Sequence, residues 1–104
     1  MLIILFRSRL TEAAGADYTA MDAELSALVQ DAPGFVAAKS YLAADGERLT
    51  VVWWRDAESL RHWRELPRHR EAQTTGRAKW YEWYSMDVAE VVRESRFDRG
   101  PGSP

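Results

Sequence analysis

The segment Arg48–Arg55 constrains the fold most strongly, because both of its alternating sides are apolar. Successive side chains of a β-strand point to opposite faces of a sheet. The two sets are Leu49, Val51 and Trp53 on one side and Val52 and Trp54 on the other. Neither face of the sheet that contains this strand can therefore be left to water. We expect the chain's own helices to cover one face and the sheet of a second copy to cover the other.

The remaining apolar periodicity predicts three further strands and two helices. The predicted strands are residues 2–8, 35–43, 48–55 and 80–93, and the predicted helices are residues 14–31 and 57–75. The first helix carries an apolar stripe of Tyr18, Met21, Leu25 and Leu28. In the second helix Asp56 is the expected N-cap, Pro67 breaks or restarts the helix, and Gly76 is expected to end it.

Turn residues and breaks in alternation define the sheet further. Asp45-Gly46 predicts a hairpin between the second and third strands, and a break in alternation predicts a bulge near Ser85–Asp87. The order β-α-β-β-α-β predicts an α+β, ferredoxin-like domain over residues 1–97. Residues 98–104 are rich in glycine and proline and are expected to form a flexible tail that buries nothing.

Composition excludes several classes of function. The 104 residues carry a formal net charge of −2, so no positive field exists to attract nucleic acid or an anionic membrane surface. The chain has no cysteine, which excludes disulfides and thiolate chemistry, and its two histidines have no third ligand in pattern, so no metal site is expected. The apolar run Met1–Phe6 is too short for a signal peptide or a membrane span, so we expect a cytoplasmic protein.

A string of residues near the end of the second helix resembles the antibiotic biosynthesis monooxygenase family. The string is Trp63, five residues, His69, Ala72-Gln73, Gly76-Arg77, Trp80-Tyr81 and Tyr84. The resemblance implies a homodimeric α+β barrel in which two four-stranded sheets pack face to face and the last strand reaches the partner. Members of this family include oxygenases that act on polycyclic aromatic phenols without a cofactor, and relatives that degrade heme. The resemblance therefore implies one of these activities.

The two kinds of relative predict different site residues. The resemblance to heme degraders implies an asparagine, a tryptophan and a histidine where this chain has Ser8, Trp63 and Gln73, and glutamine does not bind iron as an imidazole does. The resemblance to the aromatic oxygenases implies an asparagine and a tyrosine around the tryptophan, where this chain has Ser59 and His69. Only Trp63 is kept in both patterns.

Three side chains are candidates for catalysis. His69 can take and return a proton near neutral pH, or it can be a structural hydrogen-bonding residue. Trp63 is either a core residue or a donor of its indole N–H to a ligand oxygen. Arg77 could bind a phenolate or carboxylate, or pair with an acid such as Glu82.

Other residues are candidates for binding the substrate. They are Phe6, Ser8, Ser59, Gln73 and Tyr84. The alternation of a strand predicts that Trp80 and Tyr84 point to one face and Tyr81 and Trp83 to the other. We expect the pocket between the second helix and the inner face of the sheet, beside Trp63, His69 and Gln73.

Three functions remain open at this point. The first is a cofactor-independent monooxygenase that uses dioxygen on a flat aromatic or phenolic small molecule. The second is a small-molecule-binding or stress-related dimer without turnover. The third is a heme-binding or heme-degrading protein.

Overall fold

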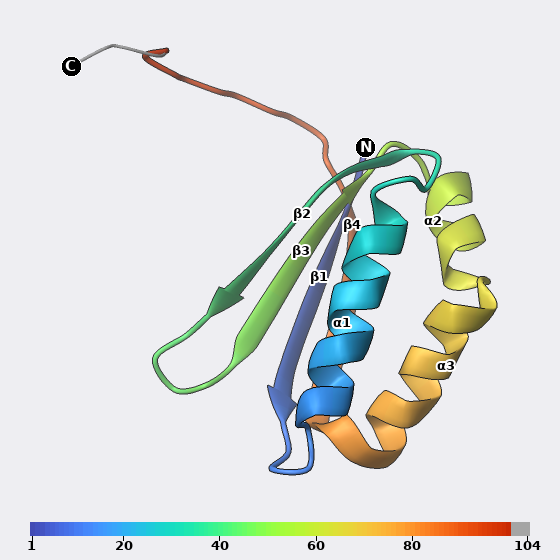
Figure 1. Ribbon diagram of the computed structural model, residues 1–104. Coiled ribbons are helices and arrows are strands. Elements are labelled where there is room, and N and C mark those ends of the chain that lie inside the picture. The colour runs from blue at the N-terminus through green and yellow to red at the C-terminus, as the bar shows by residue number, and fades with distance from the viewer. Residues whose placement is uncertain (101–104) are drawn as a thin grey trace.

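The computed structural model describes residues 1–100 and contains four strands, three α-helices and one π-helical turn (Figure 1). The strands are β1 (Leu2–Leu10), β2 (Phe35–Leu42), β3 (Arg48–Trp54) and β4 (Tyr81–Glu90). The helices are α1 (Ala16–Val29), α2 (Ala57–Arg64), α3 (Pro67–Thr75) and the π turn η1 (Gly76–Trp80). The predicted α+β class and element order are confirmed, with the second helix divided at Pro67.

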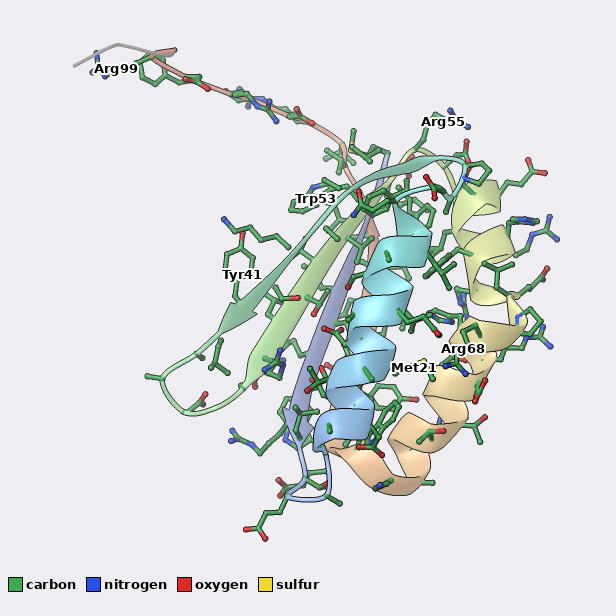
Figure 2. All side chains as sticks on the ribbon, in the orientation of Figure 1. Met21, Tyr41, Trp53, Arg55, Arg68 and Arg99 are labelled. Carbon is green, nitrogen blue, oxygen red and sulfur yellow. The ribbon has the colours of Figure 1, made fainter. Side chains whose placement is uncertain are left out.

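The sheet is antiparallel and has the strand order β2-β3-β1-β4. The three helices lie together on one side of it (Figure 1). Tyr41 and Trp53 point to the other side, which we call the open face (Figure 2). Leu5 and Leu49 belong to the same face, because Leu5 pairs with Val51 and Leu49 pairs with Arg7. No helix covers this side of β3 within residues 1–100, although Val51 is only 8 % exposed.

The strand register arranges the helix-facing side chains in rows across the sheet. One row contains Trp54 and Leu2, the next Val52, Ile4 and Val88, the third Thr50, Phe6 and Met86, and the last Arg48, Ser8 and Tyr84. The rows change from large apolar groups at one end to polar groups at the other. This gradient determines the chemistry of the space between the sheet and the helices.

The α-helix ends at Thr75 as predicted, with Gly76 as its C-cap, but Gly76 has right-handed helical angles and also begins the π turn. The predicted course of the last strand is wrong in two respects. The strand starts at Tyr81 and ends at Glu90, rather than spanning residues 80–93. The irregularity lies at Glu82, since Arg9 pairs with Trp83 and Leu10 with Tyr81. Residues 85–87, where the bulge was predicted, pair regularly with β1.

The packed core occupies one end of the interface between sheet and helices. Trp54 is 1 % exposed, and its ring centroid lies 6.2 Å from that of Trp63 and 5.7 Å from that of Phe35. Helix α1 contributes Val29 to this core rather than Leu28, which is 46 % exposed and does not belong to the buried stripe as predicted.

Helix α2 begins as the sequence predicts. The Asp56 side chain accepts a hydrogen bond of 2.8 Å from the backbone N–H of Ser59, which satisfies one of the free donors of the first turn. Leu66 is extended and Pro67 follows as the first residue of α3, a position that needs no backbone N–H. None of the helices within the described part of the chain is long and apolar enough to cross a membrane.

Residues 91–100 contain neither helix nor strand and lead away from the body of the protein (Figure 1). The expected flexible tail begins within this segment at residue 98. Its residues 101–104 lie outside the described residues, so the tail stays a prediction.

Gly34 connects α1 to β2 in a conformation that other residues rarely adopt. Its φ is +81°, and a Cβ atom at this position would overlap the side chain of Ser59. The backbone N–H of Arg55 donates to the Gly34 carbonyl at 2.7 Å, which connects this turn to the start of α2. The close packing of this turn against the first turn of α2 thus requires that residue 34 has no side chain.

We expect Gly34→Ala to lower the free energy of unfolding by about 1–3 kcal/mol, because alanine at positive φ is strained and would displace Ser59. Urea denaturation followed by tryptophan fluorescence measures this change. Gly100→Ala is the control, because Gly100 also has a positive φ of 78° but no neighbour within 4 Å of the added Cβ. Equal stability of the Gly34→Ala variant and the wild type would contradict the expectation.

Candidate functional site: a cavity between the sheet and the helices

A cavity of about 270 Å³ lies between the helix-facing rows of the sheet and helices α1, α2 and α3. It starts beside the Trp54 and Trp63 core and extends to the row of Arg48, Ser8 and Tyr84. The predicted pocket is therefore present at the predicted place. Of the predicted site residues, six line it, namely Phe6, Ser8, Trp63, His69, Gln73 and Tyr84.

Two predicted site residues do not line the cavity. Ser59 lies in the first turn of α2, next to Gly34, and borders a separate hollow between α1 and α2. Arg77 lies in the π turn, where its Nε donates to the Tyr84 hydroxyl oxygen at 3.0 Å. The sequence suggested Glu82 as its partner, and the structure gives Tyr84 instead. Arg77 is thus connected to the cavity through Tyr84, which lines it.

His69 is the most unusual polar group of the cavity. Its ring packs edge to face against Trp63 with centroids 5.5 Å apart. Its Nδ1 is buried and is the only such side-chain atom within residues 1–100 that has no hydrogen-bond partner. Leaving a buried polar atom unpaired costs about 1–3 kcal/mol, so this nitrogen is available for a ligand.

The surroundings of His69 favour the neutral imidazole. Burial lowers the pKa of His69 below its ordinary value of 6.5, and the positive charge of Arg64 lowers it further. A neutral imidazole can accept a proton through its free nitrogen. Trp63 packs against His69, and its indole N–H makes no hydrogen bond with any of the described residues. This end of the cavity therefore brings an unpaired imidazole nitrogen close to an indole whose N–H has no partner among the described residues.

Tyrosine rings surround the other end of the cavity. Phe6 stacks on Tyr84 with centroids 5.3 Å apart, and Tyr81 meets both rings edge to face at 5.6 Å. Tyr18 from α1 lies 6.3 Å from Tyr81. Burial raises the pKa of Tyr18 and of Tyr81, so both hydroxyls stay protonated and act as hydrogen-bond donors.

Tyr81 is on the cavity side because of the irregularity at Glu82. Simple alternation predicted Tyr81 on the same face as Trp83, and this prediction is wrong. The extra residue turns Tyr81 toward Tyr84, while Trp83 lies under the guanidinium of Arg7. Gly76 makes room for the ring, since a Cβ there would lie 2.6 Å from a Tyr81 ring carbon.

Charged contacts join the helices around the cavity. Arg68 of α3 binds both carboxylate oxygens of Glu24 on α1, and its Nη1 donates to Glu71 at 2.7 Å. Figure 2 shows Arg68 and Met21 between these two helices. At the start of α1, Asp17 accepts from Lys79 at 2.7 Å and from the Trp80 indole at 3.0 Å, and both contacts lower the pKa of Asp17.

Sequence reasoning missed Tyr18, Asp22 and Arg48, all of which line the cavity. Tyr18 was assigned to the apolar stripe, and Arg48 was treated as the first residue of a strand. The signal that could have found Arg48 is its pairing with Ser8, a candidate residue, across two neighbouring strands. That pairing follows from the register of β1 and β3, which are far apart in sequence.

Comparison with protein families gives one clear match. The profile of the antibiotic biosynthesis monooxygenase family matches residues 1–75. This range includes Trp63, His69 and Gln73 and ends before Arg77 and Tyr84. The uncharacterised protein YqjZ of Bacillus subtilis is 40 % identical over 70 residues, which are 67 % of this chain and 61 % of YqjZ. The chain thus spans less than two thirds of the length of this relative.

Solved structures share the fold. SnoaB, a cofactor-independent oxygenase from Streptomyces nogalater, superposes with a TM-score of 0.74 at 18 % identity, over 89 % of this chain and 94 % of SnoaB. Rv0793 from Mycobacterium tuberculosis superposes with a TM-score of 0.79 at 16 % identity, over 91 % of this chain and 98 % of Rv0793. At these identities the likeness shows a common architecture.

We expect the free energy of unfolding to decrease as the pH is lowered, and His69 to cause part of this decrease. Because the folded pKa of His69 is lowered, the unfolded chain binds this proton more readily, and the stability contribution is lost as the pH falls below 6.5. The melting temperature of the wild type should therefore fall more than that of His69→Gln between about pH 7.5 and about pH 5.5.

Two features make this measurement specific to His69. The lowered pKa values of Asp17 and Glu24 place their loss of charge below this pH window. His62 is exposed on α2, so His62→Gln should keep the pH dependence of the wild type. If His69→Gln and wild type lose stability in parallel, His69 is not responsible.

Proposed function

Because the chain belongs to the antibiotic biosynthesis monooxygenase family, we propose that it oxygenates a flat phenolic small molecule with dioxygen and without a cofactor. The observation that carries the proposal is the unpartnered, buried Nδ1 of His69 in a cavity lined by aromatic rings. A general base needs an unprotonated nitrogen within reach of the substrate proton, and a pKa below 6.5 keeps this imidazole unprotonated at neutral pH.

The roles of the cavity residues follow from their positions. His69 accepts a proton from the substrate, and the indole N–H of Trp63 donates to a substrate oxygen beside it. Phe6 and Tyr84 flank the aromatic ring. Ser8 and Gln73 offer further polar contacts from the sheet and from α3. Arg77 positions Tyr84, and because the tyrosine oxygen accepts from Arg77, its own proton remains available for the ligand.

The reaction needs only the substrate and dioxygen. His69 removes a proton from an activated ring carbon or its hydroxyl, which gives a carbanion that is stabilised by the phenolic ring system. The carbanion reduces dioxygen and forms a carbon–oxygen bond, giving a hydroperoxide after protonation. Loss of water from the hydroperoxide leaves a carbonyl group, so one oxygen atom enters the product and the other leaves as water. Dioxygen is the oxidant in this sequence, and His69 returns the proton that it removed.

A binding protein without turnover is the alternative for the same cavity. It would use the same aromatic walls and would show ligand affinity but no oxygen consumption. For a heme protein, Gln73 stands in the cavity at the position where the heme degraders have a histidine. A Soret shift on titration with hemin would be the sign of that third function.

We further propose that the protein is a homodimer joined through the open face. The apolar side chains of this face come from β1, β3 and β4, namely Ile3, Leu5, Leu49, Val51, Trp53 and Trp83. Three of the strands thus contribute apolar side chains to this face, which a second sheet of the same kind can cover. Charged residues lie among them, since Asp87 pairs with Leu5 and Lys39 with Val51. Arg7, which pairs with Leu49, forms an ion pair with Glu47 in which Nη2 and Oε1 are 2.9 Å apart.

We expect oxygen uptake with anthrones or naphthols as substrates, and a loss of at least about a hundredfold in kcat for His69→Gln, because the base is removed. An oxygen electrode measures the rate. His62→Gln is the matched control and should keep wild-type activity, since His62 is outside the cavity. Trp63→Phe should raise KM, because it removes the N–H donor but keeps an aromatic ring. Ligand binding without oxygen uptake by the wild type would favour the binding protein.

We expect light scattering to give the mass of a dimer at micromolar concentration, with an interface of roughly 2,000 Å² or more in total. Leu5→Glu should dissociate the dimer, because it places a charge at the centre of the open face opposite Val51. Leu42→Glu is the control, since Leu42 is 67 % exposed at the end of β2. A monomeric wild type would reject the dimer.

A further inference from the structure

Arg48 is a positive charge on the floor of the cavity. It is half-buried and pairs with Ser8 in the register of β3 and β1, in the row that also contains Tyr84. Its guanidinium carbon lies 6.0 Å from the ring centroid of Tyr18, so the cation is held against the wall that α1 forms. It lies in the polar row, at the other end of the cavity floor from Trp54.

Arg48 is the arginine of the sheet that has no carboxylate partner within residues 1–100. Arg7 and Arg9, the other arginines of the strands, each form a salt bridge with an acidic residue. In the helices Arg68 does so as well, whereas Arg61, Arg64 and Arg70 have no such partner in the described part of the chain. Within residues 1–100, no carboxylate oxygen lies within salt-bridge distance of Arg48. A guanidinium has five N–H donors, and no carboxylate among the described residues uses those of Arg48. These donors can therefore bind an anion in the cavity.

The groups around Arg48 are hydrogen-bond donors. The Tyr18 and Tyr81 hydroxyls stay protonated because burial and the negative charge of Asp22 raise the pKa of both. The positive charge of Arg48 opposes this rise, and hydrogen bonds with Arg48 and Tyr81 also lower the pKa of Tyr18, so the three groups contact one another. Among residues 1–100, Asp22 is the only carboxylate that lines the cavity. Asp22 lies on α1 and partly opposes the field of Arg48, so it weakens the attraction for an anion without pairing with the guanidinium.

We propose that the ligand of this cavity is an aromatic acid, whose anionic oxygen binds Arg48 and the hydroxyls of Tyr18 and Tyr81. The proposal rests on the proposed function in that it assigns the substrate class of the same cavity. The anionic group lies over the Arg48–Ser8 row, and the aromatic ring extends along Phe6 toward Trp63 and His69. The carbon that reacts is therefore on the part of the molecule remote from its acidic group.

The experiment compares 2-naphthoate with its neutral analogue 2-naphthamide, which has the same ring and nearly the same size. Binding is measured under argon by quenching of tryptophan fluorescence, because Trp54, Trp63 and Trp80 line the cavity. We expect the wild type to bind the acid at least about tenfold more tightly than the amide, as expected for a charged hydrogen bond. Arg48→Gln should abolish this preference and leave the affinity for the amide unchanged.

Three further variants test the position of the anion. Arg64→Gln removes the other arginine of the cavity, which lies near His69, and should keep the preference. Asp22→Asn should increase the preference, because it removes the opposing charge. Arg48→Lys should retain part of the preference for the acid. An unchanged circular dichroism spectrum of Arg48→Gln shows that this variant folds. Equal binding of the two probes by the wild type, binding of neither, or loss of the preference only in Arg64→Gln would overturn the proposal.

The outcome is independent of turnover. His69→Gln should lose oxygen uptake but keep the preference for naphthoate, because His69 is at the other end of the cavity. Preference for the acid without oxygen uptake by the wild type would reject the proposed function and support the binding of an aromatic acid. Oxygen uptake with neutral naphthols and no preference for the acid would support the proposed function and reject the binding of an aromatic acid.

Discussion

The contact between Trp54 and Trp63 is the constraint on which the rest of the structure depends. The two indoles fill the interface between the sheet and α2 at one end. Farther along, small residues lie on the sheet and on α3, namely Ser8, Thr50, Ala38 and Ala72, while the rings of Phe6, Tyr18, Tyr81 and Tyr84 form the walls. The cavity lies over these small residues, between the indole core and the aromatic walls.

The polarity of the cavity also follows from the sheet. Each step of two residues along β1, from Ile4 to Phe6 and Ser8, moves one row from the core toward the polar end. A neutral imidazole lies against the indole of Trp63, and a guanidinium with neutral phenols lies in the last row. A bound molecule would experience a weak base at one end and a positive field at the other, so the strand register orients any polar aromatic ligand.

Much of the fold could be predicted from local sequence patterns. The hairpin, the Asp56 cap and the break at Pro67 depend on residues close together in the chain, and the structure has all three. The Trp63 and His69 wall was predictable for the same reason, because the two residues are close in sequence, on α2 and α3 at either side of Pro67. Arg48 and Tyr81 could not be assigned, since their orientation depends on how β3 and β4 pair with β1. Pairing between distant strands leaves no signal in the spacing of residues.

The π turn at Gly76–Trp80 has a consequence for how chains of this architecture can vary in length. A π turn contains one residue more per hydrogen-bonded turn than an α-helix, and the irregularity at Glu82 is a second extra residue shortly afterwards. Deleting the residue at the irregularity would exchange the two faces of the strand on one side of it. Deleting a residue of the π turn would instead rotate the end of the helix by about 100° relative to the strand. The two extra residues therefore do not substitute for each other, and a change of length at either place would turn Tyr81 away from its present neighbours.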